Sequence, residues 1–534
     1  MAPAARPTPS VPPASVPSAP VPPAVTVVGI GADGWDGLPA ASQEALRTAE
    51  TLIGGARQLA LLPAECAGER VSWPSPLRPA VPGLLAAHAG RRIAVLASGD
   101  PMFYGIGRTL TEVLTEGLRE VLTEGLAEGP AEAPTEAPTE ASAEPLPKTS
   151  RAPVSAASSA FPASPAFPAS PASPASPASP GLRVLPHPSS VSYACARLGW
   201  PVEETEVVTL VGRPAENLLA ALYDGRRVLV LSAGAGTPAE VATLLRAHGY
   251  GPTRMRVLQQ LGGDRERTAE GTAADWAHVH SGNADDHPHH HSATDIDPLN
   301  VIALDCVREP GTLRLSAVPG LPDAAYEHDG QLTKRHVRAA TLAALAPAPG
   351  ELLWDIGGGS GSIAIEWLRA HRGCRAVTVE RDPVRAERIG RNARALGVPA
   401  LRVVTGRAPA ALDGLPTPDA VFIGGGLTVP GLLAACWDAL PEGGRIVANT
   451  VTLESEALLA DWYRRHGGEL VRLAVAHAVP VGGFTGWRQA MPVTQWTAVK
   501  PPGTPRTRTP LPANPLPANP LPANPLPHES EDPR

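Results

Sequence analysis

Short apolar runs alternate with amphipathic segments through the C-terminal half of the chain. Each run ends near glycine or a polar residue, which is typical of buried strands in a parallel sheet. Between the runs, apolar residues recur every three or four positions, as at Ala386, Ile389 and Ala393, and this spacing predicts helices. The alternation predicts a doubly wound, Rossmann-like α/β domain. Its expected strands are Leu352–Ile356, Ala376–Val379, Leu401–Thr405, Asp419–Ile423 and Arg445–Asn449.

The N-terminal half shows a similar pattern. Helices are predicted from Ser190 to Leu198 and from Pro238 to His248. One apolar run ends at Gly99-Asp100-Pro101, and α/β sheets bind ligands at such C-terminal strand ends. This half therefore predicts a second α/β domain with a ligand site of its own. Its expected strands are Val25–Gly31, the run that begins at Arg91, Leu182–Leu185, Glu206–Leu210, Arg227–Ser232, Met255–Gln259 and Leu299–Leu304.

Proline-rich tracts limit how much of the 534-residue chain can fold. About half of the 63 prolines lie in three tracts that are too poor in large apolar side chains to bury a core. We expect these tracts to form two disordered tails and a disordered insertion in the first domain. The expected order is a tail at 1–24, a first domain at 25–305 with an insertion at 127–180, a linker at 306–322, a second domain at 323–499 and a tail at 500–534.

Charge and cysteine content exclude several classes of protein. The formal charge of −7, without a long basic run, argues against nucleic-acid binding. No segment approaches about 18 uninterrupted apolar residues, so we expect no membrane span, and the proline-rich start does not resemble a secretory signal. The five cysteines are scattered without C-x-x-C spacing, which predicts reduced thiols in a cytoplasmic protein and no metal site. Six histidines in His278–His291 are interpreted as a solvated loop.

The segment around Asp355 carries the clearest ligand signal. Glycines at 357, 359 and 361 follow a predicted strand, and Glu380 ends the next strand. Such a turn lets a ligand approach the backbone, and a carboxylate after the second strand can accept both ribose hydroxyls. The dinucleotide pattern requires a glycine three positions after the second, whereas Ser362 follows here. The spacing favours S-adenosylmethionine over a dinucleotide.

Longer motifs extend these signals. The second half contains Leu332-Thr-Lys-Arg, Trp354-Asp-Ile-Gly-Gly-Gly-Ser-Gly-Ser, Val379-Glu-Arg-Asp-Pro, Ala408-Pro-Ala-Ala-Leu, Pro418-Asp-Ala-Val-Phe-Ile-Gly-Gly and Asn449-Thr-Val-Thr-Leu-Glu-Ser, and the first half contains Val28-Gly-Ile-Gly-Ala-Asp-Gly-Trp, Ala97-Ser-Gly-Asp-Pro-Met-Phe-Tyr-Gly, Pro188-Ser-Ser-Val-Ser, Ala196-Arg-Leu-Gly-Trp, Gly212-Arg-Pro and Leu261-Gly-Gly. With both sets in order, the chain resembles the decarboxylating precorrin-6Y methyltransferases of cobalamin biosynthesis. The resemblance implies a tetrapyrrole methylase fold of two α/β subdomains, followed by a class I methyltransferase domain.

The resemblance also implies an activity and a set of site residues. The first domain would methylate ring carbon 5 of precorrin-6Y, and the second would methylate carbon 15 and decarboxylate the ring C acetate, giving precorrin-8X. Each domain would hold one S-adenosylmethionine. The implied cofactor-binding residues are Thr333, Gly357, Gly358, Gly359, Ser360, Gly361, Glu380 and Ala408 in the second domain, and Gly99, Asp100, Pro101, Ser189, Ser190, Thr237 and Pro238 in the first.

Catalytic residues are less well defined by the sequence. Glu454, Asp100 and Lys334 are candidates for a general acid or base, although a helix-start carboxylate or a loop-capping Asp explains the first two equally well. Lys334 and Arg335 are also candidates for binding substrate carboxylates. We expect a homo-oligomer.

Three other functions remain open at this stage. The same reactions on cobalt-precorrins of the anaerobic pathway leave no distinct mark on the sequence. A non-catalytic scaffold that binds S-adenosylmethionine and recruits partners through its proline-rich tracts is a second alternative. Dinucleotide oxidoreduction is the third, and Ser362 disfavours it.

Overall fold

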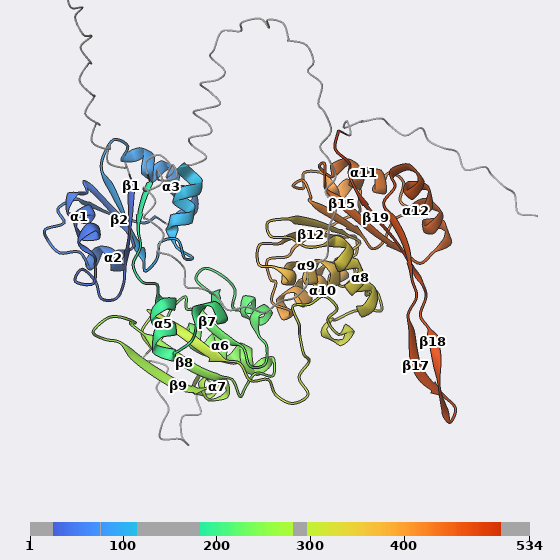
Figure 1. Ribbon diagram of the computed structural model, residues 1–534, viewed down its shortest axis with the longest axis horizontal. Coiled ribbons are helices and arrows are strands. Elements are labelled where there is room, and N and C mark those ends of the chain that lie inside the picture. The colour runs from blue at the N-terminus through green and yellow to red at the C-terminus, as the bar shows by residue number, and fades with distance from the viewer. Residues whose placement is uncertain (1–24, 75, 115–181, 281–295, 504–534) are drawn as a thin grey trace, which may run out of the picture. The chain divides into compact units, whose positions relative to one another are not determined.

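The computed structural model describes residues 25–74, 76–114, 182–280 and 296–503. These residues form two compact units, and the main division falls after Thr312. The insertion predicted at 127–180, the tail at 1–24 and nearly all of the tail at 500–534 lie outside the described residues, as does most of the histidine-rich loop. Both units combine helices with sheets (Figure 1), which confirms the predicted α/β class.

The first unit contains two sheets. One is parallel, with the order β3-β2-β4-β1-β5, and the other has the order β6-β7-β10-β8-β9, in which only β6 and β7 run parallel. The two-subdomain architecture predicted by resemblance therefore corresponds to two separate sheets. The strands are β1 Val25–Ile30, β2 Thr51–Gly54, β3 Glu69–Ser72, β4 Ile93–Ser98, β5 Leu182–Leu185, β6 Glu206–Thr209, β7 Arg227–Leu231, β8 Arg254–Gln259, β9 Arg267–Thr272 and β10 Asn300–Asp305.

Helices connect the strands of both sheets. Ser189 caps α5 by accepting a hydrogen bond from Ser192 N at 3.1 Å. The helix expected from Pro238 begins one residue earlier, at Thr237, with Gly236 at the N-cap and Pro238 in the first turn. The short strands β2, β3 and β9 were not predicted. The helices are α1 Ala40–Thr48, α2 Ala56–Ala60, α3 Leu77–Ala87, α5 Ser190–Leu198, α6 Thr237–Ala247 and α7 Ala273–His280.

The second unit is built on one seven-stranded sheet with the order β13-β12-β11-β14-β15-β19-β16. The first five strands are parallel as predicted, whereas β19 runs antiparallel to both β15 and β16. The chain order reverses between β11 and β14, and ligands of doubly wound sheets bind outside the C-terminal strand ends at such a point. The strands are β11 Leu352–Ile356, β12 Arg375–Glu380, β13 Arg402–Thr405, β14 Ala420–Ile423, β15 Arg445–Thr450, β16 Glu469–Leu473 and β19 Val493–Val499.

Two apolar clusters, one containing Trp367 and Phe422 and the other Trp437 and Trp496, form the core of this unit. Asp382 caps α10 by accepting hydrogen bonds from Val384 N and Arg385 N. Between β13 and β14 the chain forms only a short 3-10 turn, at Ala410–Leu412. The helices are α8 Arg335–Leu345, α9 Ser362–Ala370, α10 Pro383–Ala395, α11 Leu432–Ala439 and α12 Leu453–His466.

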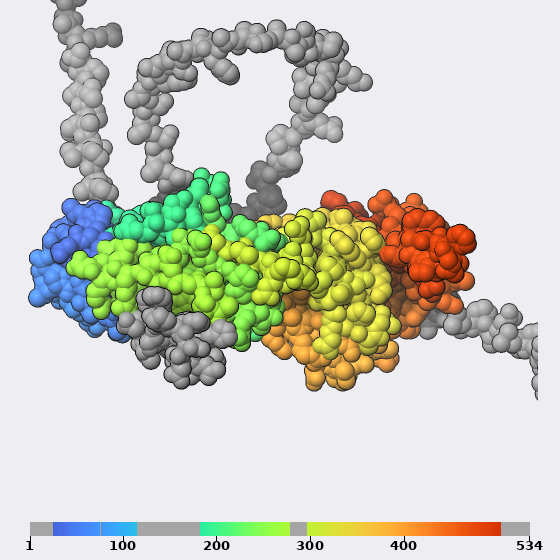
Figure 2. All heavy atoms as spheres, turned by 90° about the horizontal axis from the view of Figure 1, so that it is seen from below, coloured from blue at the N-terminus to red at the C-terminus, as the bar shows by residue number. Residues whose placement is uncertain are grey.

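A two-stranded ribbon projects from the second unit (Figure 1). It consists of β17 Ala476–Val481 and β18 Phe484–Gln489, which pair only with each other. This segment lies at the surface of its unit (Figure 2). Phe484 and Trp487 are 85% and 79% exposed, so the ribbon lacks an apolar core of its own. The sequence analysis did not predict this ribbon.

Candidate active site

The glycine turn after β11 has a backbone that only glycine adopts easily. Gly357, Gly359 and Gly361 have φ values of 75°, 61° and 77°. A Cβ on Gly357 would lie 3.1 Å from Gly425 N, and one on Gly361 would lie 2.7 Å from Ile389 Cγ2. The turn therefore packs closely against the loop after β14 and against α10, and it brings backbone N–H groups to the start of α9.

Glu380 holds this turn in place from the end of β12. Its side chain is buried, with Oε2 accepting a hydrogen bond from Gly359 N at 2.9 Å and Oε1 accepting one from Asp382 N at 3.0 Å. A carboxylate has lone pairs for further donors after these two bonds. Burial also raises the pKa of Asp355 to about 6, against the effect of a 2.8 Å hydrogen bond from Thr378. Two carboxyl groups thus lie behind the turn in fixed orientations.

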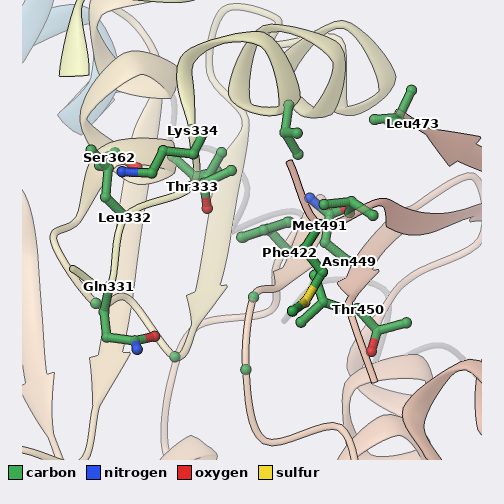
Figure 3. Close-up of a pocket in the computed structure, with 18 of the residues that line it drawn as sticks. Gln331, Leu332, Thr333, Lys334, Ser362, Phe422, Asn449, Thr450, Leu473 and Met491 are labelled. Atoms are coloured by element: carbon green, nitrogen blue, oxygen red, sulfur yellow. The ribbon is translucent and has the colours of Figure 1, made fainter. Parts of the chain in front are cut away.

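A cavity of about 570 Å³ opens in front of the turn, within the usual size range of small-molecule sites. Figure 3 shows Leu332 and Thr333 on one side of it and Phe422, Asn449 and Met491 on the other. Of the residues implied to bind the cofactor, those that line the cavity are Thr333, Gly357, Gly358 and Gly359, whereas Ser360, Gly361, Glu380 and Ala408 lie outside its lining.

A buried arginine fixes the loop that carries Thr333. Arg338 is 0% exposed and donates to the backbone carbonyls of Thr333 and Leu321. Its guanidinium also donates to Glu366 Oε1 at 2.6 Å and to Asp323 Oδ1 at 3.2 Å. Arg338 was not predicted as a site residue, because its partners come from distant segments.

A second network fixes an amide in the cavity wall. Asn449, at the end of β15, donates to Thr341 Oγ1 at 2.8 Å and accepts from Gln495 Nε2 at 2.9 Å. Gln495 also donates to Thr341 Oγ1 at 3.1 Å. Residues from α8, β15 and β19 therefore hold the Asn449 amide in one orientation, with capacity left for a ligand.

The catalytic candidates differ in their position. Lys334 lines the cavity, with Nζ 4.0 Å from Asp323 Oδ2. Glu454 lies in the exposed first turn of α12 and does not line the cavity. In the first unit, Asp100 lines a cavity of its own, but its Oδ1 accepts a hydrogen bond from Met102 N at 2.9 Å, as a loop-capping Asp does.

The first unit's cavity has a volume of about 440 Å³. It lies at the C-terminal ends of β1 and β4 and includes Gly99, Asp100, Ser189 and Ser190 from the implied set. Pro101, Thr237 and Pro238 lie outside its lining. Thr237 is buried and accepts hydrogen bonds from Ala233 N and Gly234 N, so it shapes a loop.

Arg57 is a cavity residue that the sequence analysis missed. It lies on α2 and donates to Ser98 Oγ at 3.2 Å, while Gln58 donates to the same atom at 2.8 Å. Burial lowers the pKa of Arg57, and the charge of Asp297 opposes that shift. No motif distinguishes this arginine from the many others in the sequence.

The described residues offer neither a metal-binding cluster nor a membrane-spanning helix. Within the ranges that the structure covers, His, Cys, Asp and Glu side chains do not gather in groups of three or more that could hold a metal ion. Among the helices of those same ranges, none is long and apolar enough to cross a membrane.

Comparisons with known proteins agree with these observations. A family profile described as "Tetrapyrrole (Corrin/Porphyrin) Methylases" matches residues 24–124 and 177–277, and one described as "Precorrin methyltransferase domain" matches residues 324–500. Together with the folds and cavities described above, these matches define a two-domain methyltransferase.

Curated relatives identify the family. The chain is 41% identical over 480 residues to "Precorrin-6Y C(5,15)-methyltransferase [decarboxylating]" of a Sinorhizobium species, which covers 90% of this chain and 97% of the relative. The chain belongs to this family of decarboxylating precorrin-6Y methyltransferases.

Two shorter proteins also match. "Probable cobalt-precorrin-6B C(15)-methyltransferase (decarboxylating)" of Pyrobaculum aerophilum is 34% identical over 176 residues, covering 32% of this chain and 90% of the relative. The crystal structure of the C-terminal domain of precorrin-6Y C5,15-methyltransferase from Rhodobacter capsulatus is 52% identical, covers 35% of this chain and all of that domain, and has a TM-score of 0.34.

Proposed function

We propose that this chain methylates precorrin-6Y at carbons 5 and 15 and decarboxylates the ring C acetate to give precorrin-8X, with S-adenosylmethionine as methyl donor. The 41% identity over 90% of the chain to a relative of that name carries this proposal. One cavity in each unit supports two methyl transfers. We assign carbon 15 and the decarboxylation to the second unit, because the Pyrobaculum relative named for both matches 176 residues, about the length of the precorrin methyltransferase domain at 324–500.

The second cavity fits the methyl donor. A Cβ at Gly357 would crowd Gly425 N at 3.1 Å, and the buried carboxylate of Glu380 lies directly behind Gly359. We propose that the turn takes the amino-acid part of the donor and that Glu380 accepts hydrogen bonds from the ribose. In the first unit, Gly99, Asp100, Ser189 and Ser190 would hold the donor. S-adenosylmethionine, when bound, would supply an activated methyl group on its sulfonium.

Given such a donor, the protein mainly has to orient the substrate. Fixing two reactants in a productive geometry can contribute about 7–11 kcal/mol to lowering a barrier. Asn449 and the loop held by Arg338 are rigid enough for that role. In the decarboxylation, the bond between the methylene and carboxylate carbons breaks, the macrocycle accepts the electron pair, and the methylene carbon then takes up a proton.

Mass spectrometry of precorrin-6Y incubated with the full chain and S-adenosylmethionine tests the proposal. The expected product carries two added methyl groups and has lost carbon dioxide. A parallel incubation with the cobalt-loaded substrate distinguishes the aerobic from the anaerobic reaction. Stoichiometric cofactor binding without any methylated product would contradict the proposal and would favour the scaffold alternative.

We also propose that the chain forms a homo-oligomer through the β17–β18 ribbon. An isolated two-stranded ribbon is marginally stable in water, and this one exposes Phe484 and Trp487. Multi-angle light scattering should therefore give a mass above that of one chain, and replacing both residues by serine should lower it. A monomeric wild-type chain would contradict the proposal.

We infer a cytoplasmic location from the cysteines. All five are free and buried. Reduced thiols of this kind fit a reducing compartment.

A further inference from the structure

The second unit's cavity extends well beyond the glycine turn. Its far part is lined by the start of α8, the loop after β15, His477 at the start of β17, and Ala490 and Met491 just after β18. These segments reach past the turn and Glu380, which we assign to the cofactor. The far part is therefore where the substrate of the proposed reaction would lie.

Basic side chains gather at this end of the cavity. His336 on α8 and His477 on β17 both line it, and their ring centroids are 5.9 Å apart. Arg488 on β18 is the direct cross-strand partner of His477, so both side chains emerge on the same face of the ribbon. Arg488 lies outside the cavity lining but next to His477, so two histidines line this end of the cavity and an arginine lies beside them.

Acidic side chains do not balance this cluster. Asp355 is the one carboxyl group in the cavity lining, and it is buried behind the glycine turn with Thr378 as its partner. Asp323 faces Lys334, at 4.0 Å, and the start of α8. Within the described ranges, no carboxylate pairs with His336, His477 or Arg488.

We propose that His336, His477 and Arg488 form a subsite for a carboxylate side chain of the tetrapyrrole. This inference rests on the proposed function and specifies which residues select and orient the substrate. Hydrogen bonds between basic side chains and carboxylates are among the stronger polar contacts. A carboxylate held here by the helix and the ribbon would fix the rotation of the macrocycle, so that one ring carbon faces the methyl donor.

The bound carboxylate is one that the product retains. An ion pair stabilises a carboxylate, and it would therefore oppose the loss of that same group as carbon dioxide. The ring C acetate must accordingly lie away from the subsite. The subsite acts as an anchor for orientation and takes no part in bond breaking.

Calorimetric titration of the full chain with an octacarboxylate porphyrin tests the subsite directly. His336→Gln and His477→Gln should each lower the porphyrin affinity of one class of binding sites about tenfold. The double variant should lower that affinity by less than the product of the two single effects, because both rings contact one carboxylate. The same ring with neutral amides in place of its carboxylates should bind all variants equally. His371→Gln, at an exposed turn after α9, is the matched control and should behave as wild type.

Turnover separates this inference from the proposed function. The histidine variants should raise the KM for precorrin-6Y in the carbon-15 step, with a much smaller change in kcat and an unchanged dissociation constant for S-adenosylmethionine. Unchanged KM and porphyrin affinity in the double variant would overturn the subsite while leaving the function intact. Histidine-dependent porphyrin binding without any methylated product would instead overturn the function and leave the subsite standing.

Discussion

Glu380→Ala should abolish the second methylation and the decarboxylation while leaving the first methylation intact. The variant removes the acceptor of two backbone hydrogen bonds, from Gly359 and Asp382, together with the proposed ribose contact. Loss of charge-assisted hydrogen bonds at a buried site should lower the affinity of the second unit for S-adenosylmethionine about a hundredfold or more. Mass spectrometry of the product should then show one added methyl group and no loss of carbon dioxide.

Two further variants show whether this effect is specific. Glu380→Gln keeps only one acceptor oxygen for two backbone donors. Its affinity for S-adenosylmethionine should therefore fall less than that of Glu380→Ala but remain well below that of the wild type. Glu387→Ala, at an exposed position on α10, removes the same charge outside the cavity and should have no effect. Loss of both methylations in Glu380→Ala would contradict the assignment of one cofactor site to each unit.

The glycine turn and Glu380 were predictable because both follow local rules. A buried strand, glycines at alternating positions and a carboxylate after the next strand all lie within one segment of sequence. Thr333 and Gly357 to Gly359 line one cavity, and Gly99, Asp100 and Ser189 line the other, in the first unit. The roles assigned to these residues remain predictions.

Residues brought together by distant segments were not predictable in the same way. The ribbon had a local signal, since Gly482-Gly483 separates two runs rich in β-formers, but its strands do not show the alternation of a half-buried sheet. His477 and His336 meet only because the ribbon begins beside α8. Arg338 lies on a helix in a sequence position where an arginine would ordinarily be expected to face solvent, so nothing in the sequence indicates that it is buried.

Arg338→Met should produce the largest loss of stability. The guanidinium is fully buried with Glu366, which also accepts hydrogen bonds from Tyr326 OH at 2.8 Å and from the backbone of Gly320 and Leu321. Burial, together with the Glu366 carboxylate, holds the pKa of Tyr326 well above its usual range, so this phenol stays a donor. Removing one partner of a buried ion pair leaves the other charge uncompensated and costs about 3–5 kcal/mol.

Denaturant unfolding of the full chain, followed through the transition of the second unit, measures this loss. Arg391→Met is the matched control, because its ion pair with Glu327 is about half exposed and should contribute less than about 1 kcal/mol.

Adding Glu366→Gln to Arg338→Met should recover part of the stability, since it removes the unpaired charge. The double variant should nevertheless bind S-adenosylmethionine weakly, because the Thr333 carbonyl has lost its donor and the loop at the cavity is free to move. Wild-type stability of Arg338→Met alone would show that Arg338 does not stabilise the fold, and full affinity of the double variant would show that it does not position that loop.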